Sequence, residues 1–172
     1  VGKLVPGMTA HVKPIEGIQQ GGELCLKGPN VMMGYYDGKI ITPPNEDFGY
    51  QTGDIVTIDE EGFITIQGRL KRFAKISGEM VPLTYVEELI HKHFADYTHT
   101  VVAIPHDKRG EELVLVTTKD DLLLKDITSV FTDNKYPMLF CPKKIHIVDE
   151  IPLMGTGKVD VNAAKKMVLK ST

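Results

Sequence analysis

The chain has 172 residues and a formal net charge of -3, and 42% of its residues are hydrophobic and 25% charged. This composition is typical of a globular protein, excludes disordered and fibrous classes, and gives no reason to expect nucleic acid as a partner. No apolar run approaches the roughly 18 residues that span a bilayer, so we expect no transmembrane segment in this chain. Cys25 and Cys141 lie far apart without a CxxC spacing, which indicates small apolar residues in a reducing compartment rather than a disulfide or zinc site.

The first 70 residues indicate short strands joined by turns. Residues 10–14 and 23–27 alternate apolar and polar side chains, and residues 55–58 and 63–66 flank a turn that Gly62 closes. Such a β-unit has few large apolar residues and would be marginal alone. Because the chain also begins abruptly in what looks like mid-domain sequence, we expect a fragment.

The rest of the chain indicates helices between apolar strands. Pro82 suits the first turn of a helix, in which apolar residues recur at 3/4 spacing through about residue 95. Further elements are expected as strands at 100–104, 113–117 and 143–148, a polar loop at 105–112, and helices at 126–134 and 161–169. We therefore predict an α+β fold in two pieces, with residues 1–70 the incomplete β-rich end of a larger domain and residues 71–172 a compact domain.

A basic segment lies at this boundary. Arg69, Lys71, Arg72 and Lys75 fall between Gly68 and Gly78. In a buried strand these four cations would each need a partner, so we expect that this segment does not form a buried strand. The alternative to a functional role is a solvated basic turn.

Asp54, in Thr52-Gly53-Asp54 directly before an expected strand, is a candidate ligand residue. One carboxylate can accept hydrogen bonds from two adjacent ribose hydroxyls; alternatively, it caps its own backbone in a turn. Arg69 follows the hairpin and can offer a planar donor fork to the same ligand, or be a surface arginine.

Lys158 follows the glycine-rich loop Gly155-Thr156-Gly157. The spacing is not that of a P-loop, and Val159 replaces the hydroxyl residue. An ammonium on a long stem can still reach an anion whose charge grows during a reaction; the alternative is a surface lysine. The histidines form no ligand set, and no Ser/His/Asp or Cys/His arrangement appears.

Four motifs occur in order: GELxxxGPNVMxGYY, YxTGD, GRxKRxxKxxGE and PxxxxGK. Together they resemble the C-terminal part of the adenylate-forming superfamily of acyl-CoA synthetases, adenylation domains and luciferases, over nearly the whole chain. The wording of residues 71–81 looks closest to bacterial acyl-ACP synthetase/2-acylglycerophosphoethanolamine acyltransferase proteins. The chain departs from many members at Arg72, where Asp is common, and at Ala74, where a branched apolar residue is common.

The resemblance implies a role for each motif residue. Asp54 would hold the ribose hydroxyls of ATP or AMP, assisted by Arg69, and Lys158 would contact the carboxylate and α-phosphate during acyl-adenylate formation. Lys71 would be the hinge on which a mobile C-terminal lid domain turns. The loop with Lys75, Gly78 and Glu79 would then line a tunnel for a pantetheine thiol.

The implied parent enzyme activates a fatty acid as acyl-AMP and transfers it to acyl carrier protein, with onward transfer to a lysophospholipid as one route. ATP and Mg²⁺ would be bound mainly by the missing N-terminal part, so the chain alone is expected to be inactive and to have the remainder of the enzyme as its partner. The Lys/Arg cluster 69–75 is the candidate surface for an acidic carrier protein. The alternatives are an acyl-CoA synthetase with CoA as acceptor, or a non-catalytic binding module. A cytoplasmic location is expected, with the parent at the cytoplasmic face of the inner membrane.

Overall fold

The computed structural model describes residues 1–171, and the chain divides into two compact units, Val1–Arg72 and a second that begins at Phe73. Each is described below by itself. Strands make up most of the first unit, and the second combines a sheet with helices. The α+β class predicted from the sequence is confirmed.

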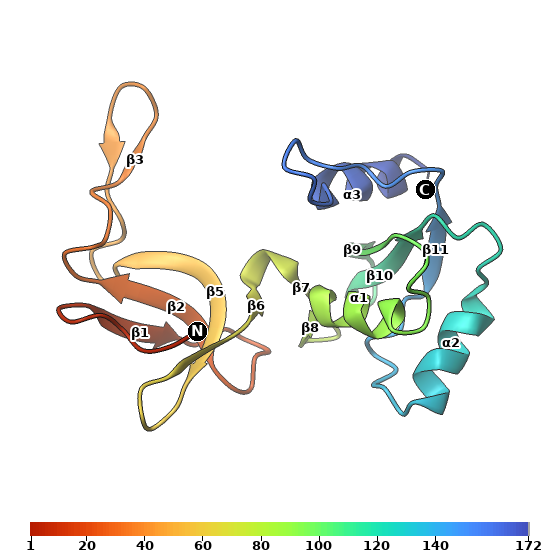
Figure 1. Cartoon of the computed structure of the whole chain (residues 1–172), viewed down its shortest axis with the longest axis horizontal. Helices are drawn as coiled ribbons and strands as arrows, with labels where there is room; N and C mark the ends of the chain where they lie inside the picture. The colour runs from red at the N-terminus through yellow and green to blue at the C-terminus, as the bar shows by residue number, and fades with distance from the viewer. Residues whose placement is uncertain (172) are drawn as a thin grey trace. The chain divides into compact units, whose positions relative to one another are not determined.

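The first unit is built on a four-stranded antiparallel sheet in the order β1-β2-β5-β6 (Figure 1). Its buried core is small and consists of Leu24, Val56 and Ile64, with partly buried neighbours packed around them. A core of this size follows from the scarcity of large apolar residues in this part of the sequence. The strands are β1 Thr9–Lys13, β2 Gly22–Lys27, β5 Tyr50–Ile58 and β6 Ile64–Arg69.

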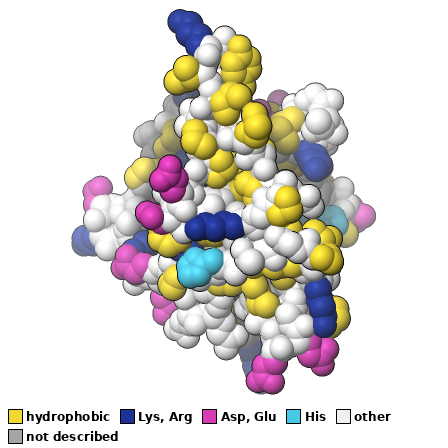
Figure 2. Space-filling view, turned by 90° about the vertical axis from the view of Figure 1, so that its left-hand side faces the viewer, with side chains coloured by type: hydrophobic (Ala, Val, Ile, Leu, Met, Phe, Trp, Pro, Cys, Tyr) yellow, Lys and Arg dark blue, Asp and Glu magenta, His cyan; other side chains and the backbone are white. Residues whose placement is uncertain are grey.

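A hairpin of β3 (Tyr35–Tyr36) and β4 (Ile41–Thr42) projects from this sheet (Figure 1). The Asp37 carboxylate accepts the backbone N–H groups of Lys39 and Ile40 and so fixes the turn. Large hydrophobic side chains are exposed along and beside the hairpin: Met33, Tyr35, Tyr36, Ile40 and Ile41. Figure 2 shows hydrophobic side chains gathered toward the top of that view. A cluster of this kind is typical of a contact surface.

The second unit contains a five-stranded sheet in the order β11-β10-β7-β8, with β9 paired to β10. The β10 strand runs antiparallel to β9 and parallel to β11. The strands are β7 Phe73–Ile76, β8 Glu79–Pro82, β9 His99–His106, β10 Gly110–Thr117 and β11 Lys144–Ile147, and the helices are α1 Leu83–His91, α2 Leu124–Asp133 and α3 Val161–Lys170.

Both faces of this sheet are buried at β9 and β10. Val101 and Leu115 pack in a cluster with residues of α1 and α2, whereas Val102 and Val116 pack in a second cluster with α3. Successive residues of a strand point to opposite faces, so a strand covered on both sides needs a continuous apolar run. This requirement explains the apolar runs of β9 and β10.

Several boundaries differ from the sequence-based expectations. The basic segment does contribute a strand, β7, in which Ala74 and Ile76 are buried while Lys75 is exposed. Strand alternation lets Lys75 face solvent between two buried neighbours, so the strand forms without burying a cation, and the exclusion of a buried strand of cations is not contradicted. Helix α1 ends at His91 rather than about residue 95, and the loop expected at 105–112 is a short turn between two longer strands. None of the helices in the described residues is long and apolar enough to cross a bilayer.

Candidate nucleotide and acyl-transfer site

Asp54 and Arg69 are directly opposite each other on β5 and β6. The Arg69 Nε lies 2.9 Å from Asp54 Oδ1, and Arg69 Nη1 donates a hydrogen bond to the Thr52 carbonyl at 3.0 Å. The ion pair uses Oδ1 of Asp54, and the second carboxylate oxygen, Oδ2, is not part of it. The side chain of Asp54 is 17% exposed and that of Arg69 65%. The carboxylate, which accepts hydrogen bonds, is therefore more buried than the guanidinium group, which donates them.

The backbone around Asp54 is irregular, contrary to the expectation that Asp54 precedes a strand. Asp54 lies within β5, next to Gly53 with a φ of 73°. The hydroxyl of Thr52 donates to the Leu24 carbonyl at 3.0 Å and accepts the backbone N–H of Asp54 at 3.0 Å. Thr52 thus fixes the position of Asp54. Thr52 belongs to the YxTGD motif, but no residue spacing in the sequence reveals this contact.

Tyr50 adds a hydroxyl near this pair. A hydrogen bond with Tyr35 raises the pKa of Tyr50, and the nearby charge of Asp54 adds to this effect while Arg69 opposes it. A tyrosine is protonated at neutral pH even at its ordinary pKa of about 10, so Tyr50 can act as a hydrogen-bond donor.

Lys71 occupies the exposed centre of η1, the 3₁₀ turn Leu70–Arg72 that ends the first unit. The division between the compact units falls after Arg72. The position of Lys71 beside this division is compatible with the expected hinge role.

Lys75, Gly78 and Glu79 belong to the exposed β7–β8 hairpin. Ser77 and Gly78 both have positive φ values, 52° and 91°, as a two-residue type I′ turn requires. The backbone N–H of Lys75 donates to Glu111 Oε2 at 2.7 Å. Glu111 therefore holds the hairpin from a position 36 residues along the chain. Sequence reasoning missed it, because no motif carried a signal for this contact.

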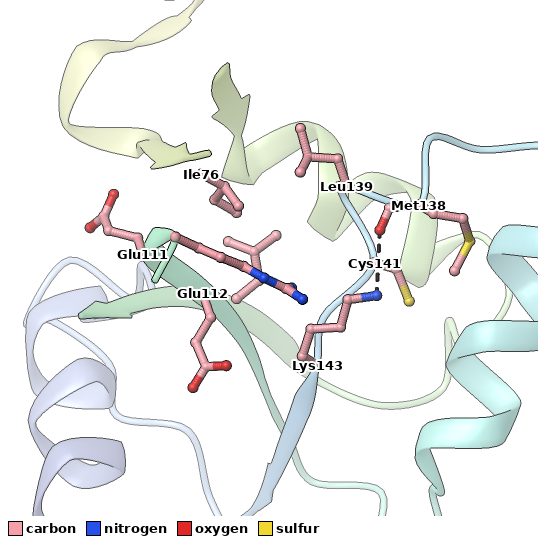
Figure 3. A pocket seen from close by; sticks show the side chains of 9 residues that line it. Ile76, Glu111, Glu112, Met138, Leu139, Cys141 and Lys143 are labelled. Atoms are coloured by element: carbon pink, nitrogen blue, oxygen red, sulfur yellow. Dashed lines mark hydrogen bonds between the residues drawn. The ribbon is translucent and has the colours of Figure 1, made fainter. Parts of the chain in front are cut away.

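A cavity of about 290 Å³ lies beside this hairpin (Figure 3). Ile76 forms one side, Met138 and Leu139 form another, and Lys143 donates to the Met138 carbonyl at 3.5 Å. Cys141 also lines the cavity, and burial raises the pKa of its thiol. A thiol with a raised pKa is a poor nucleophile. Both cysteines are free and buried, as expected from the sequence.

Lys158 is exposed in a tight loop of the second unit. Leu153 and Val159 form a bridge across the loop, and the Lys158 carbonyl accepts the backbone N–H of Met154 at 2.7 Å. Beyond the loop, the carboxylate of Asp160 accepts the backbone N–H of Ala163 at 2.9 Å and caps α3. The loop backbone is therefore anchored at both ends while the ammonium group of Lys158 reaches solvent.

The structure thus brings together Asp54 and Arg69 in the first unit, and Lys75, Gly78 and Glu79 in the second. Lys158 belongs to the second unit as well. Among residues 1–171, no group of three or more His, Cys, Asp or Glu side chains could hold a metal ion. These residues do not build a magnesium site, and we derive no step through that ion.

Comparison with known proteins identifies the family. Residues 85–158 match the AMP-binding enzyme C-terminal domain. A long-chain-fatty-acid–CoA ligase of Escherichia coli is 33% identical over 81% of this chain and 25% of its own length. Luciferin 4-monooxygenase of Photinus pyralis is 28% identical over 99% of this chain and 33% of its own length. The chain belongs to the adenylate-forming superfamily and matches its C-terminal part.

Solved structures agree with this assignment. The crystal structure of ATP-bound MatB from Rhodopseudomonas palustris has a TM-score of 0.71 and 29% sequence identity, covering 97% of this chain and 35% of that protein. A luciferase relative and an acyl-CoA ligase relative are matched over a third or less of their own lengths. The chain therefore spans a minor part of the proteins it resembles.

Proposed function

We propose that the chain is the C-terminal part of an AMP-forming fatty acid ligase that uses CoA as its acceptor. A carboxylate oxygen of the fatty acid would attack the α-phosphorus of ATP, and the bond to the bridging oxygen would break to release pyrophosphate. The thiol sulfur of CoA would then attack the acyl carbon, lose its proton to solvent and release AMP. The observation that carries this proposal is the 33% identity to a long-chain-fatty-acid–CoA ligase over 81% of the chain.

Asp54 and Arg69 fit the nucleotide-binding role. The second oxygen of the Asp54 carboxylate lies outside the ion pair and can accept hydrogen bonds from the ribose hydroxyls. Arg69 holds the carboxylate in place through Nε while its Nη1 is tied to Thr52. Because Arg69 is held by the ion pair with Asp54 and by the hydrogen bond to Thr52, it loses little conformational freedom when the nucleotide binds.

Lys158 fits the stabilisation of charge during acyl-adenylate formation. Its anchored loop presents one ammonium group, which can approach the carboxylate and α-phosphate oxygens where negative charge is concentrated. Lys71 would serve as the hinge between the two half-reactions, and the turn with Lys75, Gly78 and Glu79 would line the path of the pantetheine thiol in the second.

CoA is favoured over acyl carrier protein as the acceptor, because several similar proteins are named fatty-acid–CoA ligases. Transfer to acyl carrier protein with onward lysophospholipid acylation rests on the wording of residues 71–81 and on the Lys/Arg cluster 69–75. ATP as the nucleotide is supported by the ATP-bound MatB structure. Mg²⁺ would be bound mainly by the part of the enzyme outside this chain.

The β3–β4 hairpin supports the proposal that further enzyme segments pack on this chain. Its exposed side chains, among them Tyr35 at 64% and Tyr36 at 69%, form an apolar surface. We expect the remainder of the enzyme to cover it. Tyrosine iodination of the 172-residue chain and of the full-length enzyme tests this: equal modification of Tyr36 in both would contradict it.

The decisive experiment is fatty-acid-dependent ATP–pyrophosphate exchange by the full-length enzyme, followed by addition of CoA or holo acyl carrier protein. Exchange with thioester formation on CoA is expected. Exchange with transfer to the carrier protein alone would show that acyl carrier protein, and not CoA, is the acceptor. No exchange with any carboxylate would refute the ligase assignment.

A further inference from the structure

Strand β5 is irregular at the point where it carries Asp54. In its pairing with β2, Glu23 lies opposite Ile55, and Cys25 lies opposite Gln51. Leu24 alone therefore faces the β5 residues 52–54, which makes this segment a bulge in the sheet. A bulge interrupts the ladder of backbone hydrogen bonds, so buried backbone groups beside it need other partners.

The hydroxyl of Thr52 bridges this bulge. It donates a hydrogen bond to the Leu24 carbonyl of β2 at 3.0 Å and accepts the backbone N–H of Asp54 at 3.0 Å. A hydroxyl group can do both at once, because it has one donor and two acceptor lone pairs. One side chain thus connects Asp54 to the neighbouring strand where the backbone ladder is interrupted.

Thr52 also contacts the ion-pair partner of Asp54. The Thr52 carbonyl accepts a hydrogen bond from Arg69 Nη1 at 3.0 Å, and Arg69 Nε lies 2.9 Å from Asp54 Oδ1. The three residues therefore form a closed ring of contacts. Without the hydroxyl this ring opens, Asp54 loses its link to β2, and its carboxylate is held less firmly.

We infer that Thr52 is a positioning residue that sets how well the enzyme distinguishes ATP from its deoxy analogues. This inference rests on the proposed function, because Thr52 acts through the hydrogen bonds that Asp54 would make to the ribose hydroxyls. Such bonds weaken steeply when donor and acceptor are misaligned. A site that holds a hydroxyl in well-placed hydrogen bonds rejects an analogue without it, because polar groups of the site are then left unpaired. Discrimination therefore depends on where the Asp54 carboxylate is held.

The test compares Thr52→Val with Thr52→Ser in the full-length enzyme. Valine keeps the branched shape of threonine without the hydroxyl, whereas serine keeps the hydroxyl without the methyl group. Fatty-acid-dependent pyrophosphate exchange would be measured with ATP, 2′-deoxy-ATP and 3′-deoxy-ATP at varied nucleotide concentrations. The wild type should prefer ATP to at least one of the two analogues.

The preference for ATP should then shrink in one variant and not in the other. Thr52→Val should lower kcat/KM for ATP about 10-fold, the loss typical of one hydrogen bond to a charged group. It should lower kcat/KM for the disfavoured analogue clearly less, because that analogue lacks a hydroxyl for Asp54 to bind. Thr52→Ser should retain the wild-type preference.

Thr57→Val is the matched control, because Thr57 is a second half-buried threonine of β5 and lies outside the bulge. Its hydroxyl accepts a hydrogen bond from Gln67 Nε2 at 3.4 Å, and its loss should leave the preference for ATP unchanged. A merely structural defect reduces the amount of folded enzyme. It therefore lowers the rates with all three nucleotides by one factor, and the ratio between them stays constant.

A double-mutant cycle shows whether Thr52 acts through Asp54. Two residues that act as one unit have effects that do not add. Thr52→Val should therefore lower kcat/KM for ATP much less in an Asp54→Asn background than in the wild type.

Several results would overturn the inference while leaving the ligase assignment in place. Wild-type exchange with equal losses for all three nucleotides in Thr52→Val is one, and equal use of all three by the wild type is another. The same change of preference in Thr57→Val, or equal effects of Thr52→Val with and without Asp54→Asn, would also overturn it. Absence of wild-type exchange with any carboxylate refutes the ligase assignment itself, and with it the role given to Thr52.

Discussion

His99 and Thr117 are opposite each other on β9 and β10, and the Nδ1 atom of His99 lies 2.9 Å from the Thr117 hydroxyl. The other ring nitrogen, Nε2, lies 2.9 Å from the carbonyl oxygen of Phe94. A carbonyl oxygen accepts hydrogen bonds but cannot donate them, so Nε2 carries the proton and Nδ1 of the neutral ring accepts from Thr117. The same hydroxyl oxygen accepts the backbone N–H of Lys119 at 3.0 Å. This chain of hydrogen bonds favours the neutral imidazole.

We predict that acid destabilises the second unit through His99. Burial lowers the pKa of His99, His91 on α1 and Lys119 beyond β10 act in the same direction, and the hydrogen bond to Phe94 opposes them. The unfolded chain, with a histidine pKa of about 6.5, then binds more protons than the folded one as the pH falls. The contribution is complete above about pH 6.5 and is lost as the pH falls toward the lower folded pKa. Urea unfolding followed by circular dichroism at several pH values measures it.

Two variants isolate this contribution from that of the carboxylates. His99→Gln should be less stable at neutral pH but should lose less stability between about pH 7 and pH 5 than the wild type. His93→Gln, at an exposed position just after α1, should keep the wild-type pH dependence. An identical pH dependence in His99→Gln and wild type would contradict the assignment.

The elements with a clear hydrophobic period were predictable from the sequence. The apolar runs of β9 and β10, and the spaced apolar residues of α2 and α3, indicated these elements within a few residues. The β7–β8 hairpin was not predictable in the same way, because Lys75 masks the buried pair Ala74 and Ile76. The charge of the basic segment hides the alternation of buried and exposed side chains that forms β7.

The site was predictable in its residues but not in its contacts. Asp54 and Arg69 were assigned to one ligand, yet their pairing depends on the register of β5 and β6, which shifts between Ile55 and Val56. No local pattern encodes such a shift. The support given by Thr52 and Glu111 likewise comes from tertiary contacts that the order of residues does not reveal.

The turn at Gly78 should tolerate no side chain without a cost in stability. Gly78 has a φ of 91°, and a residue with a Cβ in left-handed backbone loses about 1 to 2 kcal/mol. Gly78→Ala should therefore lower the free energy of unfolding by about that amount in urea unfolding followed by circular dichroism. Gly155→Ala is the matched control: space around both glycines is open, but Gly155 lacks the positive φ, so its effect should stay within about 0.5 kcal/mol. Similar losses in both variants would contradict the explanation.

The Asp54–Arg69 pair should matter for nucleotide use more than for stability. Arg69 is 65% exposed, and ion pairs this accessible to water contribute less than about 1 kcal/mol. In the full-length enzyme, Asp54→Asn should raise the KM for ATP about 10-fold or more, because it removes a charged acceptor of hydrogen bonds. Steady-state adenylation at varied ATP concentrations measures this. Asp59→Asn is the control, since the Asp59 carboxylate accepts the backbone N–H groups of Glu61 and Phe63 in the turn between β5 and β6. It should affect stability and leave the KM for ATP unchanged, and a similar KM increase in both variants would refute the role of Asp54.

Lys158→Ala should separate the two half-reactions of the full-length enzyme. Loss of a cation that stabilises developing charge slows the affected step about 100-fold to 1,000-fold. We expect this loss in pyrophosphate exchange, whereas thioester formation from preformed acyl-AMP should change little, because Lys158 is assigned to the first step alone. Lys166→Ala, which removes an exposed lysine from α3, should leave both rates unchanged. Equal losses in the two half-reactions of Lys158→Ala would show that the residue acts on folding or on domain movement instead of on the charge of the adenylation step.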